Sequence, residues 1–445
     1  MNSLRTETES EAGLAVDDLQ ETWRLLDSEE RLEAFLDLPR ADAEDFFLGL
    51  TARDQYELVM LVPAVQRRSW MRLLPPDDAA DVIQEGEDDE RSELLGLLDE
   101  QTRRDVLALL AYAEDDAGGL MNPRYARLRP DMTVDEAISY LRRQARDVLE
   151  SIYYGYVIGD DQVLAGVVSF RELFAADPSR RVREVMQTDI IVAREDQDQE
   201  VLSRLFDQHN LIAIPVVDAG GRMQGIVTVD DIVDVVREET TEDIQKMGGT
   251  EALDAPYLSV SVPAMVRKRV GWLAALFVSE MLTTTAMSRF ESEISRAVVL
   301  AVFIPLIISG GGNSGSQATT LVIRAMVLGE VRLRDWWLVI RRELVTGLSM
   351  GLILGAIAFS RVELWEVLFH SYGVHHILVA YTIAGSVIGV VTWGTLAGSM
   401  LPFLLRRFGL DPASASAPFV ATLVDVTGIV IYFTVASSIL RGTLL

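Results

Sequence analysis

The sequence contains no cysteine, which excludes disulfides, thiolate metal sites and cysteine nucleophiles. Its four histidines, His209, His370, His375 and His376, are too few and too scattered for most histidine-based metal chemistry. A net charge of −27 argues against nucleic acid as a partner, because phosphate binding needs a basic surface. No nucleophile–base pair and no phosphate-binding loop is recognisable, so nothing indicates an enzyme.

The charge is unevenly distributed along the 445 residues, a length that suggests two to four domains. Residues 1–260 carry a net charge of −31, whereas residues 261–445 carry +4. Such asymmetry between two halves indicates two different environments. We expect a soluble acidic half followed by an apolar half.

Five long apolar stretches follow Arg269, at 271–290, 297–326, 343–362, 377–405 and 417–440. Each is near or above the roughly 20 residues that a helix needs to cross a hydrocarbon layer of about 30 Å. The alternative is the buried helical core of a large soluble protein, but five such runs joined by short polar segments favour membrane spans.

Lysine and arginine indicate the orientation of these spans. If the N-terminal half lies inside, the segments at the inner ends of the spans hold ten of these residues. The segments at the outer ends, with the C-terminal tail, hold four. The positive-inside rule therefore predicts a multi-pass protein of the plasma membrane with a cytosolic N-terminal half and its C-terminus outside.

An acidic residue, Asp425, lies near the middle of the last apolar stretch. A carboxylate there costs about 2.5–3.5 kcal/mol on insertion scales, so it should face a cavity or a partner. On a helix, Ala421, Thr422 and Gly428 share its face, and this small polar stripe suits a water-filled path. The alternative is a structural acid satisfied by an arginine or a hydroxyl.

The segment 310–317, GGGNSGSQ, is also unusual for a span. Its glycines weaken a helix by up to about 1 kcal/mol each, and backbone freed within a membrane must line water or be buried in protein. Its carbonyls, with Asn313 and Gln317, would be oxygen donors suited to Mg²⁺, and a symmetric dimer would supply two copies of Asp425. The alternative is a close contact between helices through small residues.

The acidic half contains an internal repeat over 121–236, with copies that begin at Met121 and Met186. Each copy has the pattern of a helix, two β-branched strands joined by a turn, and a final helix, which indicates a paired α/β module. Residues 1–120 have the spacing of short helices separated by proline. The charge of the half favours a sensor of divalent cations, although a generally acidic, salt-adapted surface with only two lysines is the alternative.

The chain resembles the MgtE family of magnesium channels and transporters along essentially its whole length. The resemblance rests on the order of its parts, including a tandem repeat of the CBS (cystathionine-β-synthase) type, and on five segments: AEDDAGGLMNP (113–123), VTVDDIVDVVREETTEDIQKMGG (227–249), FIPLIISGGGNSGSQATTLVIRAM (303–326), MLPFLLRRFGLDPA (400–413) and PFVATLVDVTGIVIYF (418–433).

The resemblance implies a homodimeric, Mg²⁺-selective channel that imports Mg²⁺ and is closed by cytosolic Mg²⁺. It implies that Asp425 holds hydrated Mg²⁺ in the pore, which Ala421 also faces. The positions that match the cytosolic Mg²⁺ ligands are Asp218, Asp230, Glu251, Asp254 and Asp411. ATP is a further ligand of the family's CBS pair, and Thr228 with Asp231 fits a ribose-binding pattern, for which a simple helix cap is the alternative.

The sequence thus predicts a multi-domain protein: an all-α acidic N-terminal domain (1–120), tandem α/β CBS domains (121–240), a connecting or plug helix (241–270) and an α-helical transmembrane domain with five spans (271–445). Its expected partners are a second copy of itself, membrane lipid and Mg²⁺. The alternatives are a secondary transporter of divalent cations and a membrane-anchored CBS nucleotide sensor whose spans only dimerise. The second alternative leaves Asp425 and the glycine segment without a role.

Overall fold

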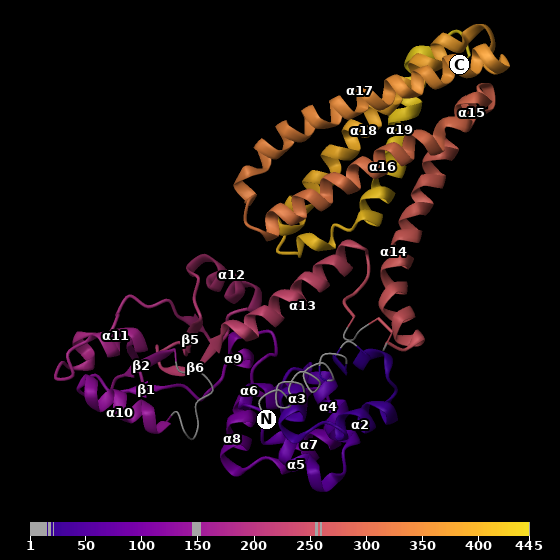
Figure 1. Cartoon of the computed structure of the whole chain (residues 1–445). Coiled ribbons are helices and arrows are strands. Elements are labelled where there is room, and N and C mark those ends of the chain that lie inside the picture. Colours follow the sequence, from indigo (N-terminus) through magenta and orange to yellow (C-terminus); the bar gives the residue numbers. More distant parts are fainter. Residues whose placement is uncertain are drawn as a thin grey trace, which may run out of the picture. The chain divides into compact units, whose positions relative to one another are not determined.

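The computed structural model in Figure 1 describes residues 16, 19–20, 22–144, 153–253, 257–258 and 260–444. The chain divides into two compact units, Met1–Arg237 and Glu238–Leu445. The long helix α13 (Val229–Met247) begins in the first unit and ends in the second.

The first unit opens with short helices, as the proline spacing predicts. Pro39, Pro63 and Pro75 stand directly before helices, and Asp27 and Asp99 cap two others by accepting backbone N–H bonds. The elements are η1 (Trp23–Leu25), α2 (Ser28–Leu36), α3 (Arg40–Leu48), α4 (Ala52–Leu61), α5 (Ala64–Met71), α6 (Pro76–Gln84), α7 (Asp88–Leu97), α8 (Glu100–Leu109) and α9 (Ala117–Leu120).

The internal repeat forms two small α/β modules, which confirms the predicted fold class. Each has a three-stranded sheet in the order of the chain, with a parallel first pair and an antiparallel second pair. Sequence analysis missed the two-residue first strand of each sheet. The elements are β1 (Arg127–Leu128), α10 (Val134–Gln144), β2 (Tyr154–Ile158), β3 (Leu164–Ser169), α11 (Phe170–Ala175), η2 (Val182–Glu184), β4 (Ala193–Arg194), α12 (Gln199–His209), β5 (Ala213–Val217) and β6 (Met223–Thr228).

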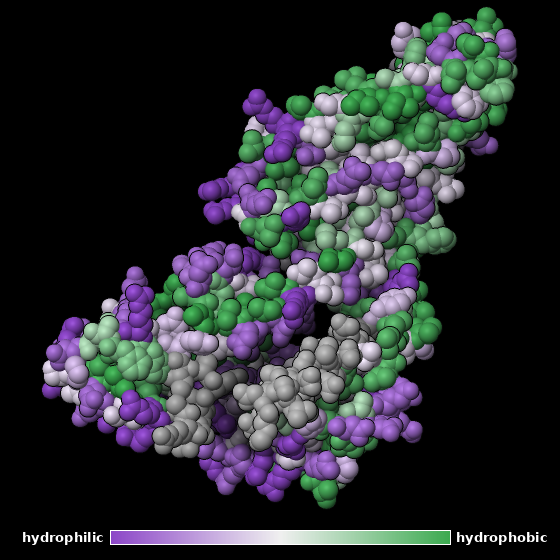
Figure 2. All heavy atoms as spheres, viewed as in Figure 1, coloured by the Kyte–Doolittle hydropathy of each residue, from purple (hydrophilic) through white to green (hydrophobic). Residues whose placement is uncertain are grey.

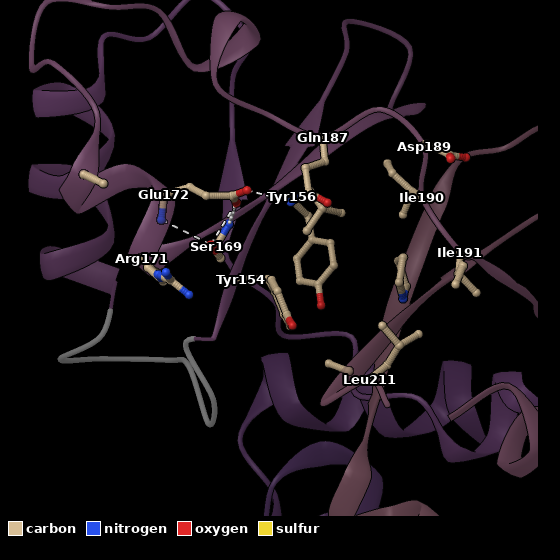
Figure 3. Close-up of a pocket in the computed structure, with 14 residues that line it drawn as sticks. Tyr154, Tyr156, Ser169, Arg171, Glu172, Gln187, Asp189, Ile190, Ile191 and Leu211 are labelled. Carbon is tan, nitrogen blue, oxygen red and sulfur yellow. Dashed lines mark hydrogen bonds between the residues drawn. The ribbon is translucent and has the colours of Figure 1, made fainter. Parts of the chain in front are cut away.

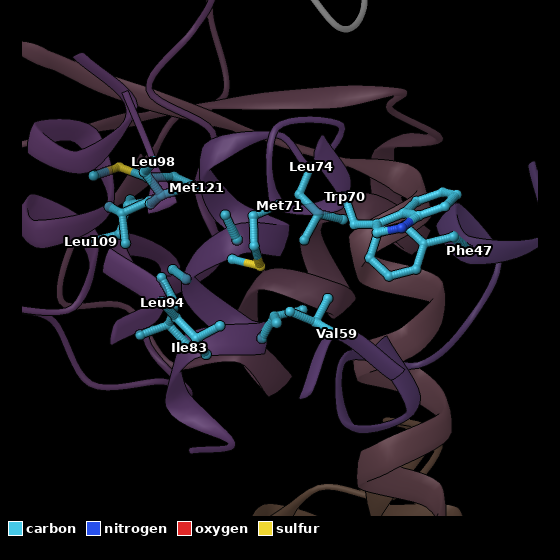
Figure 4. Packing of buried hydrophobic residues seen from close by; sticks show 14 of the residues in the cluster. Phe47, Val59, Trp70, Met71, Leu74, Ile83, Leu94, Leu98, Leu109 and Met121 are labelled. Carbon is cyan, nitrogen blue, oxygen red and sulfur yellow. The ribbon is translucent and has the colours of Figure 1, made fainter. Parts of the chain in front are cut away.

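The N-terminal helices and the second repeat share one hydrophobic core. Figure 4 shows its centre, where Met71, Ile83 and Leu94 gather with their neighbours. The same cluster continues into the second repeat through Ile214 and Val227, both fully buried. Burial of this kind contributes about 1.5–3 kcal/mol for each large apolar side chain, so the helices and the second repeat stabilise each other.

Among the described residues of the second unit, five helices are long and apolar enough to cross a membrane, in agreement with the five predicted spans. Hydrophobic side chains cover much of their outer surface, as Figure 2 shows. The elements are α14 (Val262–Arg289), α15 (Glu291–Arg296), α16 (Val298–Val327), η3 (Leu333–Asp335), α17 (Trp336–Phe369), η4 (Gly373–His375), α18 (His376–Arg407), η5 (Pro412–Ser414) and α19 (Ala417–Leu440).

The glycine segment 310–317 does not interrupt its helix, so the expectation of freed backbone carbonyls is wrong. Residues 298–327 form one continuous helix, α16. A side chain at Gly394 or Gly398 of α18 would collide with the backbone of Gly311 or Gly315 of α16. The alternative interpretation, a close helix–helix contact through small residues, is the one that the structure supports.

Candidate functional site

Asp425 is the ninth of the 24 residues of α19 and is only partly buried. Its carboxyl group lies close to the carboxyl group of Glu280, which is on α14. Neither side chain takes part in an ion pair within the part of the chain that the structure describes. Within the described residues no arginine therefore satisfies Asp425, which is one of the two forms of the structural alternative.

The neighbouring face of α19 is made of small residues. Ala421, one turn before Asp425, lies opposite the backbone of Gly312, whose missing side chain would stand 3.6 Å from Ala421. Ser316 of α16 donates a hydrogen bond to the carbonyl of Ala417 at 3.2 Å. The start of α19 is thus held against α16 by small and polar groups, which leaves little room for bulky side chains near Asp425.

A row of polar side chains on α16 points away from the helices that pack on it. We name it the polar stripe: Ser309, Asn313, Gln317 and Thr320, each exposed or only partly buried. Their spacing of three or four residues places them on one face. Polar groups on the outside of an apolar helix require a water path or a partner.

Asp411 is engaged by a cation of the protein itself. One of its carboxylate oxygens accepts a hydrogen bond from the Nζ of Lys246 at 2.8 Å, and the other accepts the N–H of Ala413 at 2.8 Å. Lys246 also pairs with Glu242 at 2.6 Å. Burial would lower the pKa of Lys246, but the hydrogen bonds from Asp411 and Glu242 outweigh it and raise that pKa above its usual range.

Four carboxylates influence one another electrostatically near the start of α13. We name them the acidic cluster: Asp78 of α6 with Asp230, Asp231 and Asp234 of α13. Burial, with the nearby charges of Asp230 and Asp234, raises the pKa of Asp78 to about 6. The nearby negative charges make it harder to ionise Asp78. A bound cation would offset their repulsion and stabilise the ionised carboxylates.

The other predicted cytosolic ligands are not gathered into one place. Asp218 caps the hairpin turn by accepting the N–H groups of Gly220 and Arg222, each at 2.8 Å. Glu251 is exposed in the connection between α13 and α14, and its N–H donates to the carbonyl of Lys268. Asp254 lies outside the described residues. Among the residues that are described, no three acidic or histidine side chains stand close enough to hold a metal ion on their own.

Thr228 and Asp231 form a helix cap at the start of α13. The carboxylate of Asp231 accepts the N–H of Thr228 at 3.0 Å and its hydroxyl at 2.7 Å. Burial raises the pKa of Asp231 to about 6; the hydrogen bonds from Thr228 oppose this shift, whereas the charges of Asp230 and Asp78 add to it. The first repeat has an equivalent cap, in which Ser169 donates to Glu172 at 2.8 Å.

A cavity of about 610 Å³ lies between the two repeats, on the side of the Ser169–Glu172 cap. The rings of Tyr154 and Tyr156 project into it, with Arg171 on one side and Ile191 on the other (Figure 3). Glu172 is held by Gln187 at 2.6 Å. Thr228 and Asp231 are not among the residues that line this cavity.

Tyr156 is unusual because its side chain is 2% exposed and its hydroxyl makes no hydrogen bond to any residue that the structure describes. A buried hydroxyl without a partner costs free energy, and a ligand in the cavity would relieve that cost.

Sequence analysis missed Asp78, Asp234 and Lys246 as members of these clusters. Asp78 stands in the pair of acids after Pro76, where the sequence indicates only a helix start. Charge alone did not single it out, because many other acids of this region are solvated.

Models of known families match most of the chain. Residues 14–115 match the MgtE intracellular N domain, residues 117–179 and 182–238 match the CBS domain, and residues 304–435 match the family described as a divalent cation transporter, MgtE. These matches follow the order of the helical part, the two repeats and the membrane helices.

Two relatives extend over most of their own lengths. The magnesium transporter MgtE of Thermus thermophilus is 40% identical over 428 residues, which are 96% of this chain and 93% of the relative. The magnesium transporter MgtE of Enterococcus faecalis is 32% identical over 337 residues, 76% of this chain and 72% of the relative.

A solved structure resembles the soluble part. The cytosolic domain of the Mg²⁺ channel MgtE in complex with ATP is 39% identical, covers 53% of this chain and 97% of its own, and has a TM-score of 0.47. The family matches and the extent of the two relatives agree with an acidic residue placed within five apolar helices. The chain belongs to the MgtE family of divalent cation transporters.

Proposed function

We propose that the protein is a homodimeric channel that imports Mg²⁺ across the plasma membrane and is closed by Mg²⁺ in the cytosol. The N-terminal half then lies in the cytosol and the C-terminus outside. The names of the two relatives, both magnesium transporters, support Mg²⁺ as the ion.

The observation that carries the proposal is the carboxyl group of Asp425, which is partly buried within an apolar helix and has no cationic partner among the described residues. Intramembrane acids mark ion pathways by default, because an idle charge there costs several kcal/mol. Mg²⁺ gives up its waters reluctantly and is usually held by one or two carboxylates.

The polar stripe on α16 supports the second copy of the chain. Asn313 and Gln317 would be costly against lipid, whereas they can line water at a twofold axis. Two chains facing each other across the polar stripe would enclose a conduit with Asp425 beside it.

Closure by Mg²⁺ is supported by the separation of acids along the chain. Asp218 and Asp230 belong to the first unit, whereas Glu251 and Asp411 belong to the second. A cation that binds these carboxylates more tightly in the closed state would favour that state, and several sites of 1–2 kcal/mol each would approach the roughly 5.5 kcal/mol of a near-complete switch.

Patch recording of the purified protein tests this function. Inward current carried by Mg²⁺ should fall when millimolar Mg²⁺ is added on the cytosolic face. Glu251→Gln combined with Asp254→Asn should keep the current high under the same conditions. Current that ignores cytosolic Mg²⁺ in the unmodified protein would contradict the proposed closure.

A secondary transporter is the second candidate, and the contact between Glu280 and Asp425 is what favours it, since paired intramembrane acids serve ion coupling in transporters. A channel should carry Mg²⁺ in proteoliposomes with equal pH on both sides. Flux that requires a proton or Na⁺ gradient would favour the transporter.

Asp78→Asn should stabilise the cytosolic unit at pH 7 by about 1–3 kcal/mol. An acid with a pKa near 4 unfolded and about 6 folded binds more protons in the folded state between those values, so stability falls as pH rises from 4 to 6 and stays low above. The asparagine removes this loss. Thermal unfolding of the full protein in detergent at pH 4.5 and pH 7.5, without Mg²⁺, measures both effects.

The matched control is Asp88→Asn, which changes an exposed acid at the start of α7. It should leave the pH dependence as it is. Added Mg²⁺ should raise the stability of the unmodified protein by more than it raises the stability of the Asp78→Asn variant. If Mg²⁺ stabilises both proteins equally, the acidic cluster is not part of the Mg²⁺ sensor, and the acidic charge is better explained as a salt-adapted surface.

We also propose that ATP occupies the cavity between the repeats. Tyr154, Tyr156 and Ile191 can enclose a planar base, Arg171 can meet a phosphate, and the unpartnered hydroxyl of Tyr156 can read the edge of the base. This places the nucleotide beside Ser169 and Glu172, the counterparts of Thr228 and Asp231.

Arg171→Ala should weaken ATP binding at least tenfold, because one charge-assisted contact to phosphate contributes about 1.5–3 kcal/mol. Titration calorimetry of the full protein with ATP measures it. Asp231→Asn keeps an oxygen for the Thr228 cap and serves as the comparison. If Asp231→Asn binds ATP more weakly and Arg171→Ala binds it unchanged, ATP binds at the second repeat, beside Thr228 and Asp231, and not in the cavity.

A further inference from the structure

A second acid accompanies Asp425 within the same chain. Glu280 stands at the nineteenth of the 28 residues of α14, well inside the apolar helix. Its carboxyl group lies close to that of Asp425. Like Asp425, it is partly buried and has no ion pair within the described residues.

Contacts before and after Glu280 and Asp425 hold α14 against α19. Before the pair, the Nε1 of Trp272 donates to the Oγ of Ser416 at 3.1 Å, and the ring of Trp272 lies 5.9 Å from that of Phe419. After the pair, the rings of Phe290 and Phe433 stack at 4.9 Å, measured between their centroids.

The spacing of these contacts is similar on both helices. The steps from Trp272 to Glu280 and on to Phe290, the residue directly after α14, are eight and ten residues. The steps from Phe419 to Asp425 and on to Phe433 in α19 are six and eight. At 1.5 Å per residue the two helices advance together, so they run parallel and the carboxyl pair stands at matching heights. The pair is therefore fixed by the packing of α14 on α19 rather than by a chance orientation of side chains.

An unsatisfied hydroxyl follows the pair along α14. The Oγ1 of Thr283, one turn after Glu280 on the same face of α14, is buried and makes no hydrogen bond to any described residue. A buried hydroxyl of this kind is suited to a water of a hydrated ion. It is an observation independent of the two acids.

We propose that Glu280 is a second carboxylate of the ion site, acting together with Asp425 in each chain. This inference rests on the proposed function, in which Asp425 faces the ion. When both carboxyl groups are ionised, their charges repel each other strongly in a medium of low dielectric constant, and a divalent cation or its inner water shell between them offsets that repulsion. Glu280 supplies the second negative charge of the site, which suits a divalent rather than a monovalent ion.

Mg²⁺ uptake by the full protein in proteoliposomes, followed with a Mg²⁺-sensitive dye over a range of external Mg²⁺, tests the inference. Glu280→Gln should raise the Mg²⁺ concentration for half-maximal uptake at least tenfold while the rate at saturating Mg²⁺ changes less than twofold. Glu280→Asp, which keeps the charge, should restore half-saturation to within about threefold of the unmodified protein. Glu343→Gln, at another partly buried acid of a membrane helix, is the matched control and should behave as the unmodified protein.

The outcomes separate this inference from the proposed function. If Asp425→Asn is inactive and Glu280→Gln has unchanged half-saturation, Glu280 is structural and only the inference fails. If Asp425→Asn transports normally, the proposed function itself fails. If Glu280→Gln is inactive, Glu280→Asp decides: recovery of uptake supports the need for a carboxylate, and an equally inactive protein overturns the inference because the position then requires shape and not charge.

Discussion

Asp425→Asn is expected to abolish Mg²⁺ uptake, with a loss of at least about a hundredfold. The substitution keeps the size and the hydrogen-bonding shape of the side chain and removes its charge. Because the site contains few other charges, the loss of one carboxylate removes much of what offsets the dehydration of Mg²⁺. Rescue of growth in a host that lacks Mg²⁺ import, together with dye-monitored uptake in proteoliposomes, measures the effect.

The folded state of Asp425→Asn serves as its own control. Asparagine can still form a hydrogen bond with Glu280, so the variant should elute as the same single species in detergent and melt at or above the temperature of the unmodified protein. Loss of a buried charge is stabilising when that charge has no cationic partner. Full growth rescue by this variant would contradict the assignment of Asp425 to the ion path.

The general architecture could be predicted because its signals are local in sequence. An apolar stretch of about twenty residues indicates a span wherever it packs, and the repeat at Met121 and Met186 is visible by comparing the chain with itself. The short strands β1 and β4 were missed because two residues, such as Ala193 and Arg194, carry no periodic pattern.

The composition of the clusters could not be predicted, since it depends on contacts between distant segments. Asp78 lies near Asp230 although they are far apart in the sequence, and Lys246 meets Asp411 across 165 residues. The position of Asp425 was evident from its cost in a membrane, whereas its contact with Glu280 required the packing of α14 on α19. Charge in an apolar segment identifies a site; the fold decides which residues complete it.

The glycine segment illustrates how packing can override propensity. Helix propensity alone predicts that glycines at 310–312 and 315 weaken α16, yet the helix is continuous. Gly311 and Gly315 face Gly394 and Gly398, so the backbones of α16 and α18 approach closely enough to touch. Dispersion attraction between the two closely packed backbones compensates for the poor propensity of glycine.

Gly394→Ala is therefore expected to destabilise the membrane unit by about 2–4 kcal/mol, although alanine favours a helix by roughly 1 kcal/mol over glycine. The added methyl group would overlap the carbonyl of Gly311, and a backbone atom in a packed helix cannot move aside. A loss of this size lowers the melting temperature of a unit of about 200 residues by about 5–15 °C. Fluorescence-detected size exclusion after heating in detergent measures it.

Gly385→Ala on the same helix α18 is the matched control. A methyl group there would meet Val435 at 3.5 Å, an ordinary van der Waals contact, so the propensity of alanine should prevail and the melting temperature should stay equal or rise slightly. Equal melting temperatures for the two variants would mean that α16 and α18 separate readily. The close approach of their glycines would then no longer explain why α16 remains a helix.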